Sequence, residues 1–254
     1  MNDRASRWRR ISAFCLFVGY GRSGHSAVGS VIDAHPQAVV AHELNAVRRY
    51  FEGVERDVLF DEIFALSQAQ ARAGRQSPRA EGGNYPQGLD GQVKPYPGGI
   101  TVIGDKKGAG TARQFARHGL HRIDDFKSYI GVPVKVLHVV RNPFDIVAAG
   151  MAAGRSGFAE IVAIVADIRQ RCLGDDWLDV YHERLIAEPR EEVARIATFL
   201  GLPVLPQHLD DAVAHVYTQP HRRRFETDWP DGARAMVEKI IARHDYFGGY
   251  TWHR

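Results

Sequence analysis

The sequence of 254 residues predicts an α/β protein with a central parallel β-sheet flanked by helices. Two nearly continuous apolar runs, residues 12–19 and 134–140, are typical of strands covered on both faces. Stretches of helical periodicity separate such runs, and strands that alternate with helices form parallel sheets with right-handed crossovers. A glycine-rich turn directly after the first run is the third indication. Because no repeat or linker interrupts this pattern, we expect one domain over residues 1–254.

The other elements follow from the same periodicities. We expect further strands at residues 38–41, 100–104 and 177–181. We expect helices at residues 26–34, 47–73, 111–119, 143–153, 158–172, 189–200, 206–216 and 232–244. Residues 74–99 contain many glycine and proline steps and hardly any periodicity, so we predict a long loop or lid insertion there.

Composition narrows the class of protein. Hydrophobic residues make up 44% and charged residues 25%, which is usual for a globular protein with a core. The net charge of +3 is too small for a protein that coats nucleic acid, although clustered arginines still suit a small polyanion. Cys15 and Cys172 stand too far apart in sequence for a CxxC site, so we expect neither a disulfide framework nor a metal site. The apolar run at residues 11–19 is too short to cross a bilayer, and we predict a cytoplasmic protein without a membrane span.

The glycine-rich turn is the most informative motif. It reads Gly19-Tyr20-Gly21-Arg22-Ser23-Gly24-His25-Ser26 and joins a predicted strand to a predicted helix. Glycines let successive backbone N–H groups converge on an anion, and a helix N-terminus adds positive potential. The spacing matches the phosphate-binding P-loop of nucleotide hydrolases, but His25 stands where that motif has lysine, and Arg22 supplies the cation. We therefore expect this turn to bind an anion.

Four segments, taken together and in this order, resemble a known family. They are Arg22-Ser23-Gly24-His25-Ser26 with His35-Pro36, Arg141-Asn142-Pro143-Phe144-Asp145, residues 181–201, and Arg222-Arg223-Arg224 with Asp228-Trp229. These segments resemble those of sulfotransferases that use 3′-phosphoadenosine-5′-phosphosulfate, including bacterial members of that family. The resemblance implies a three-layer P-loop-like fold.

The resemblance also implies how the nucleotide is held. It places the 5′-phosphosulfate on Arg22, Ser23, Gly24, His25 and Ser26, and the 3′-phosphate on Arg141 with Arg222 and Arg223 as partners. A guanidinium suits a phosphate because it makes paired hydrogen bonds. Three positions depart from the family pattern: His25 replaces a threonine or serine, Ala149 a phosphate-binding serine, and His182 a tyrosine that often contacts adenine.

Three residues are candidates for the chemical step: Arg22, whose charge would stabilise the leaving 5′-phosphate oxygen, Glu43 and Lys106. Glu43 follows the predicted strand at residues 38–41, at the edge of the sheet where α/β proteins place their sites, and we interpret it as the general base. The alternatives are that Glu43 caps the next helix or that His42 is the base. Lys106 resembles a family lysine near the reacting sulfate, but a solvated basic turn explains Lys106 and Lys107 nearly as well.

The resemblance therefore implies transfer of a sulfuryl group to a hydroxyl or amine of a small-molecule, glycan or lipid acceptor, without a metal. The product nucleotide is 3′-phosphoadenosine-5′-phosphate. Two alternatives stay open at this point. One is a P-loop nucleotide kinase or nucleoside triphosphatase, and the other is a non-catalytic nucleotide-binding member of the same fold.

Overall fold

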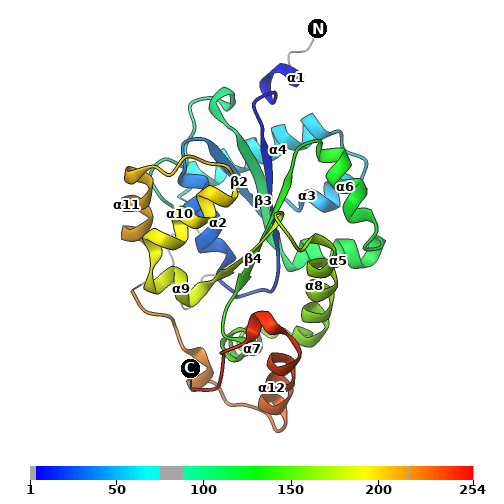
Figure 1. Ribbon diagram of the computed structural model, residues 1–254, viewed down its shortest axis with the longest axis vertical. Helices are drawn as coiled ribbons and strands as arrows, with labels where there is room; N and C mark the ends of the chain where they lie inside the picture. Colours follow the sequence, from blue (N-terminus) through cyan, green and yellow to red (C-terminus); the bar gives the residue numbers. More distant parts are fainter. Residues whose placement is uncertain (1–3, 75–87, 217, 254) are drawn as a thin grey trace.

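The computed structural model describes residues 4–74, 88–216 and 218–253, and it confirms the predicted α/β architecture of three layers (Figure 1). The central sheet is parallel throughout and has the strand order β2-β3-β1-β4-β5. Its strands are β1 (Ala13–Val18), β2 (Ala38–His42), β3 (Val102–Gly108), β4 (Val134–Val140) and β5 (Trp177–Tyr181). The chain leaves β1 toward β2 on one side, while β4 lies on the other side. The carboxyl end of β1 is therefore the topological switch point, where α/β sheets open a crevice for ligands.

Helices cover both faces of the sheet. One face carries α2 (His25–Ala34), α9 (His182–Ala187), α10 (Pro189–Phe199) and α11 (Pro206–His215). The opposite face carries α3 (Ala46–Phe51), α4 (Arg56–Arg72), α5 (Ala109–His118), α6 (Arg122–Ile130) and α8 (Phe158–Cys172). Beyond the carboxyl edge of the sheet, α7 (Pro143–Met151) and α12 (Ala233–Arg243) lie together near the C-terminus, at the end of the molecule opposite the N-terminus (Figure 1). Short pieces complete the chain: α1 (Arg4–Arg7) and the 3₁₀ turns η1 (Pro97–Gly99), η2 (Arg223–Phe225) and η3 (Asp245–Phe247).

Strand β1 shows why its sequence is apolar throughout. Phe14 and Leu16 pack in the hydrophobic core on the α4–α5–α8 face, whereas Cys15 and Phe17 pack in the core on the α2–α10 face. Successive side chains of a strand point to opposite faces, so a strand covered on both sides needs apolar residues at every position. Gly104 in β3 lets the backbones approach, because a Cβ atom there would lie 2.1 Å from the carbonyl oxygen of Cys15.

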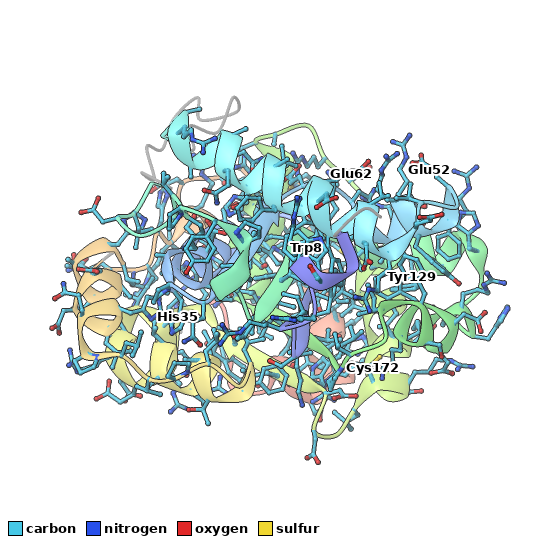
Figure 2. All side chains as sticks on the ribbon, turned by 90° about the horizontal axis from the view of Figure 1, so that it is seen from above. Trp8, His35, Glu52, Glu62, Tyr129 and Cys172 are labelled. Atoms are coloured by element: carbon cyan, nitrogen blue, oxygen red, sulfur yellow. The ribbon has the colours of Figure 1, made fainter. Side chains whose placement is uncertain are left out.

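The segment before β1 is anchored to α4. The buried Trp8 donates from its indole nitrogen to Asp61 Oδ1 at 3.2 Å and packs edge-on against Phe60 at 6.0 Å between ring centroids (Figure 2). The two cysteines, Cys15 and Cys172, are buried and unpaired. Among the described residues, no helix has the length and apolar character needed to cross a membrane.

Several element boundaries differ from the prediction. The helix expected at residues 47–73 is broken into α3 and α4, because the chain turns at Gly53 with φ +80°. Strand β3 starts at Val102 and runs to Gly108, so Lys106 lies inside the strand and not beyond it. Helices α6 and α9 were not predicted, although Ile123, Phe126 and Ile130 give α6 its apolar face. Half of the predicted lid, residues 75–87, lies outside the described residues. In the described part, residues 88–99, the short η1 turn is the one regular element.

Candidate active site

A pocket of about 1370 Å³ opens at the switch point, beyond the carboxyl ends of β1, β3 and β4. Its wall comes from the glycine-rich turn and from the residues that directly follow β2 and β4. Helices α5, α7, α9 and α12 and the start of α8 add to it, as does the segment between α11 and α12, here called the C-terminal loop. Most of the predicted site residues line it: Arg22, Gly24, His25, Ser26, Glu43, Lys106, Arg141 and Arg223. Ser23 and Arg222 are not among its lining residues.

The glycine-rich turn curls through two left-handed residues, Arg22 with φ +72° and Gly24 with φ +103°. Gly24 immediately precedes α2, and the first backbone N–H groups of a helix have no partner within it, so they are available to an anion. A Cβ atom at Gly24 would lie 2.5 Å from Cδ2 of His182, so only glycine fits under that ring. The turn thus has the geometry of an anion cradle.

Ser23 and His25 stabilise the turn from inside. The buried hydroxyl of Ser23 donates to the carbonyl oxygen of Tyr20 at 3.2 Å and lies 3.0 Å from Nδ1 of His25. The imidazole of His25 is held against Gly19 and Gly108, where Cβ atoms would lie 2.9 and 2.7 Å from its Nε2. Burial lowers the pKa of His25 to about 3, so the ring is neutral near pH 7. At Ser23 only the backbone is therefore available to a ligand. The ring of His25 is neutral and is packed inside the turn.

Glu43 and Lys106 meet at the edge of this cradle. Lys106 Nζ lies 3.4 Å from Glu43 Oε1 and donates to Ser26 Oγ at 3.2 Å, while Lys107 Nζ lies 3.0 Å from Glu43 Oε2. Partial burial raises the pKa of Glu43, but the two lysines outweigh it, and the pKa lies below its ordinary value. Burial lowers the pKa of Lys106 in spite of the opposing charge of Glu43. The proposed base and the proposed sulfate ligand are thus a contacting ion pair.

The turn that carries Glu43 is tied down by a residue that the sequence analysis did not assign. The buried carboxylate of Asp105 accepts hydrogen bonds from the backbone N–H groups of Leu44 and Ala46, both at 2.9 Å. Glu43 and Asn45 have φ +70° and +68°, which is a strained conformation for residues other than glycine. Asp105 therefore positions Glu43 by holding the turn around it. This carboxylate comes from the strand residue directly before Lys106.

Of the alternatives to Glu43, His42 has a different environment. Its backbone N–H donates to Gln70 of α4 at 3.0 Å, and its ring faces Gly29 of α2, where a Cβ atom would lie 3.2 Å from Nε2. His42 does not line the pocket. The structure therefore favours Glu43 over His42 as the group that reaches a ligand.

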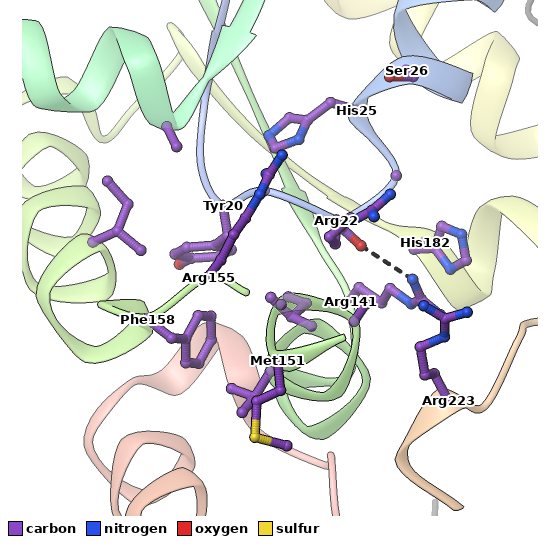
Figure 3. A pocket seen from close by; sticks show the side chains of 18 of the residues that line it. Tyr20, Arg22, His25, Ser26, Arg141, Met151, Arg155, Phe158, His182 and Arg223 are labelled. Carbon is purple, nitrogen blue, oxygen red and sulfur yellow. Dashed lines mark hydrogen bonds between the residues drawn. The ribbon is translucent and has the colours of Figure 1, made fainter. Parts of the chain in front are cut away.

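Arg141 joins the glycine-rich turn to the C-terminal loop. It donates from Nη1 to the carbonyl oxygen of Arg22 at 3.1 Å, the dashed bond in Figure 3, and from Nη2 to the carbonyl oxygen of His221. Burial lowers the pKa of Arg141. Arg223 and His182 lie beside it (Figure 3). Arg141, Arg223 and His182 form one end of the pocket, which we call the basic end. It extends from the carboxyl edge of the sheet to the C-terminal loop.

The three consecutive arginines of the C-terminal loop have three different environments. Arg222 is exposed and Arg223 lines the pocket, whereas Arg224 is buried. Arg224 pairs with Asp145 of α7 through its guanidinium and through its backbone N–H, at 2.9 Å from Asp145 Oδ1. The sequence alone did not separate Arg224 from its neighbours. The loop is thereby locked to the helix that follows Arg141.

Two further arginines of the lining were missed by the sequence analysis, Arg113 of α5 and Arg155 between α7 and α8. No local motif marks Arg113. The glycines at 154 and 157 mark a turn around Arg155, but they do not show that it folds back over the pocket.

Comparison with known proteins points to one family. Residues 151–227 match the family model described as "Sulfotransferase domain". No protein with a curated description matches the chain in sequence.

Solved sulfotransferase structures share the fold. The sulfotransferase domain of the Curacin biosynthetic pathway has a TM-score of 0.55 at 10% identity, covering 92% of this chain and 98% of that one. A sulfotransferase from Mycobacterium avium has a TM-score of 0.53 at 10% identity, covering 95% of this chain and 78% of that one. The sulfotransferase domain of the Synechococcus PCC 7002 olefin synthase has a TM-score of 0.52 at 12% identity, covering 92% of this chain and 94% of that one. Residues 151–227 thus resemble a sulfotransferase domain, and the chain shares its fold with solved sulfotransferases.

Proposed function

We propose that the protein transfers a sulfuryl group from 3′-phosphoadenosine-5′-phosphosulfate to a hydroxyl or amine of a small-molecule, glycan or lipid acceptor. One observation carries this proposal. One pocket at the switch point of the sheet is lined by the anion cradle, by the Glu43–Lys106 pair and by Arg141 at its basic end. Its volume of about 1370 Å³ exceeds the roughly 300–1,000 Å³ of a pocket for one small ligand, which suits a donor and an acceptor together.

The pocket has polar groups that fit a phosphorylated nucleotide. Nε of Arg141 and Nδ1 of His182 are buried and have no hydrogen-bond partner among the described residues. Buried polar atoms are rarely left unpaired in native structures, so each such atom indicates a missing partner. The lowered pKa of His182, about 3, follows from burial and from the charge of Arg141 and keeps its ring neutral. A 3′-phosphate on Arg141, with the nucleotide beside His182, would supply both partners.

The roles of the chain's own residues follow from their positions. The donor, when bound, supplies an activated sulfuryl group on its 5′-phosphate. Glu43 would take the proton of the acceptor as the new bond to sulfur forms and the bond from sulfur to the 5′-phosphate oxygen breaks. Arg22 and the turn's N–H groups would stabilise the charge that grows on that oxygen, and Lys106 the sulfuryl oxygens.

Lys106 links the two roles. While it pairs with Glu43, the pKa of that carboxylate is held low, which makes Glu43 a weak base. When Lys106 turns to the sulfuryl oxygens, Glu43 loses a cationic neighbour and its pKa rises. The base would thereby strengthen only when the donor is in place. The family match favours sulfuryl transfer over the reaction of a P-loop kinase. A P-loop kinase would also need a lysine at the position of His25.

Nucleotide binding provides the first test. We expect 3′-phosphoadenosine-5′-phosphate to raise the melting temperature without added metal, and to raise it more than ADP or ATP does, because a ligand of the folded state stabilises it by mass action. Incubation with labelled donor and a panel of acceptors, read by the gain in mass of one sulfuryl group, tests turnover. Equal shifts with ADP would show that the 3′-phosphate is not recognised. A magnesium-dependent preference for ATP would support the kinase alternative.

Arg141 separates recognition of the 3′-phosphate from the rest of the site. In Arg141→Ala we expect the Kd for 3′-phosphoadenosine-5′-phosphate to rise about 30- to 150-fold, roughly 2–3 kcal/mol, the scale of a charge-assisted hydrogen bond. Arg141→Lys keeps the charge but loses the paired hydrogen bonds of a guanidinium, so its Kd should lie between those of the unchanged protein and Arg141→Ala. Titration calorimetry measures all three, with Arg243→Ala, an exposed arginine of α12, as the control. Native affinity in Arg141→Ala would place the 3′-phosphate elsewhere.

A further inference from the structure

The pocket carries far more positive than negative charge. Among its described lining residues Glu43 is the one acid. Seven are basic: Arg22, Lys106, Lys107, Arg113, Arg141, Arg155 and Arg223. The proposed donor contacts account for Arg22, Lys106, Arg141 and Arg223, and Lys107 is paired with Glu43. Arg113 and Arg155 are left without an assigned partner.

Arg155 folds over the glycine-rich turn. Its Nη1 lies 3.1 Å from the position that a Cβ atom of Gly21 would take. Its guanidinium makes no hydrogen bond or ion pair with the residues that the structure describes, and the segment around it is exposed. In Figure 3 the side chain runs toward His25, on the side of the pocket away from Arg223 and His182. A cation that lies in a basic pocket without a counterion is placed where an anion binds.

Arg113 is the second cation left without an assigned partner. It lies on α5, one turn after Gly110, which also lines the pocket. Arg113 is exposed and has no ion pair or side-chain hydrogen bond within the described ranges. Helix α5 packs against α8, which begins three residues after Arg155, and both arginines line the pocket.

The pocket also has an apolar wall. Ile146 and Met151 of α7, Phe158 of α8 and Met236 of α12 line it, and Figure 3 shows Phe158 and Met151 on the side where Arg155 begins. None of these residues belongs to the segments assigned to phosphate binding. Methionine and aromatic side chains form adaptable walls for apolar ligands.

Resting on the proposed function, we propose that the acceptor is an amphiphile with an anionic group of its own. Its carboxylate or phosphate binds Arg155 and Arg113, and its apolar part lies on the wall formed by α7, α8 and α12. Guanidinium groups suit such anions because they make paired, charge-assisted hydrogen bonds. The reacting hydroxyl or amine would then lie near Glu43, between this anion site and the cradle.

Binding of matched probes tests the proposal without knowledge of the natural acceptor. The protein is first saturated with 3′-phosphoadenosine-5′-phosphate and then titrated with decanoate or with 1-decanol, which share the alkyl chain and differ in charge. We expect decanoate to bind at least tenfold more tightly than 1-decanol. In Arg155→Gln and Arg113→Gln this preference should fall to threefold or less. Arg117→Gln, an exposed arginine on the same helix as Arg113 that does not line the pocket, should keep the preference.

The possible outcomes separate this proposal from the proposed function. Failure of 3′-phosphoadenosine-5′-phosphate to bind would contradict the donor assignment itself. Binding of that nucleotide with equal affinities for decanoate and 1-decanol would overturn the anionic acceptor alone. A preference for decanoate that survives in both arginine variants would also overturn it. If the variants instead lose nucleotide affinity and keep the preference, Arg155 and Arg113 serve the donor.

Discussion

Replacing Glu43 with glutamine is expected to lower turnover about a hundredfold or more while leaving nucleotide binding near its native level. A general base contributes roughly two to four orders of magnitude, and glutamine cannot accept the proton that a carboxylate accepts. The loss should fall on kcat, because the missing interaction acts in the transition state. Glutamine keeps the shape of the side chain and can still accept a hydrogen bond from Lys106. Steady-state rates, together with the Kd for 3′-phosphoadenosine-5′-phosphate, measure both effects.

Two comparisons make this result specific. Glu238→Gln alters an exposed acid of α12 that does not line the pocket, and it should leave kcat unchanged. The pH profile adds an independent readout, because a general base at Glu43 would act as carboxylate and the pKa of Glu43 lies below the ordinary value. The value of kcat/KM, which reports the free enzyme, should therefore persist through neutral pH and fall only as the pH drops through that lowered pKa. Joint loss of stability and binding in Glu43→Gln would indicate a structural role in the strained turn, and unchanged turnover would move the base to another residue.

Replacing Asp145 with alanine is expected to lower the free energy of unfolding by about 3–5 kcal/mol, because it leaves the buried Arg224 without its counter-charge. Asp145 and Arg224 are both 2% exposed, and their contact joins α7 to the C-terminal loop. Arg224 also donates from Nε to the carbonyl oxygen of Trp252 at 2.7 Å. Nucleotide affinity should fall as well, because the same loop carries Arg223 and the carbonyl of His221 that Arg141 binds. Urea unfolding and nucleotide titration measure the two effects.

A double variant distinguishes the charge from the packing. Asp145→Leu combined with Arg224→Met replaces the pair with apolar groups and should recover most of the unfolding free energy, since a buried pair is often no more stable than such a replacement. Asp228→Ala, in the exposed part of the same loop, should change stability by less than about 0.5 kcal/mol. A loss below about 1 kcal/mol in Asp145→Ala would show that the pair is not a structural lock.

Local patterns in the chain were sufficient for most elements of the fold. Strands β4 and β5 and helix α8 have the predicted boundaries, because a continuous apolar run or a strict helical period decides such elements within a short window. The missed elements have a local reason too. Helix α9 follows β5 without a break, and nothing in its six residues separates it from the strand.

Sequence by itself therefore determined the α/β class, the glycine-rich turn between β1 and α2, and the positions of Glu43 and Arg141 directly after strands, since each depends on neighbours along the chain. Only the tertiary structure decided the strand order and the contacts that make the pocket. Glu43 is 63 residues from Lys106, and Asp145 is 79 residues from Arg224, so each pair forms only when the sheet and its helices have assembled. The same holds for Arg155, whose position over Gly21 is set by the turn between α7 and α8. Side-chain direction depends on the packing of distant elements, and no local pattern carries that information.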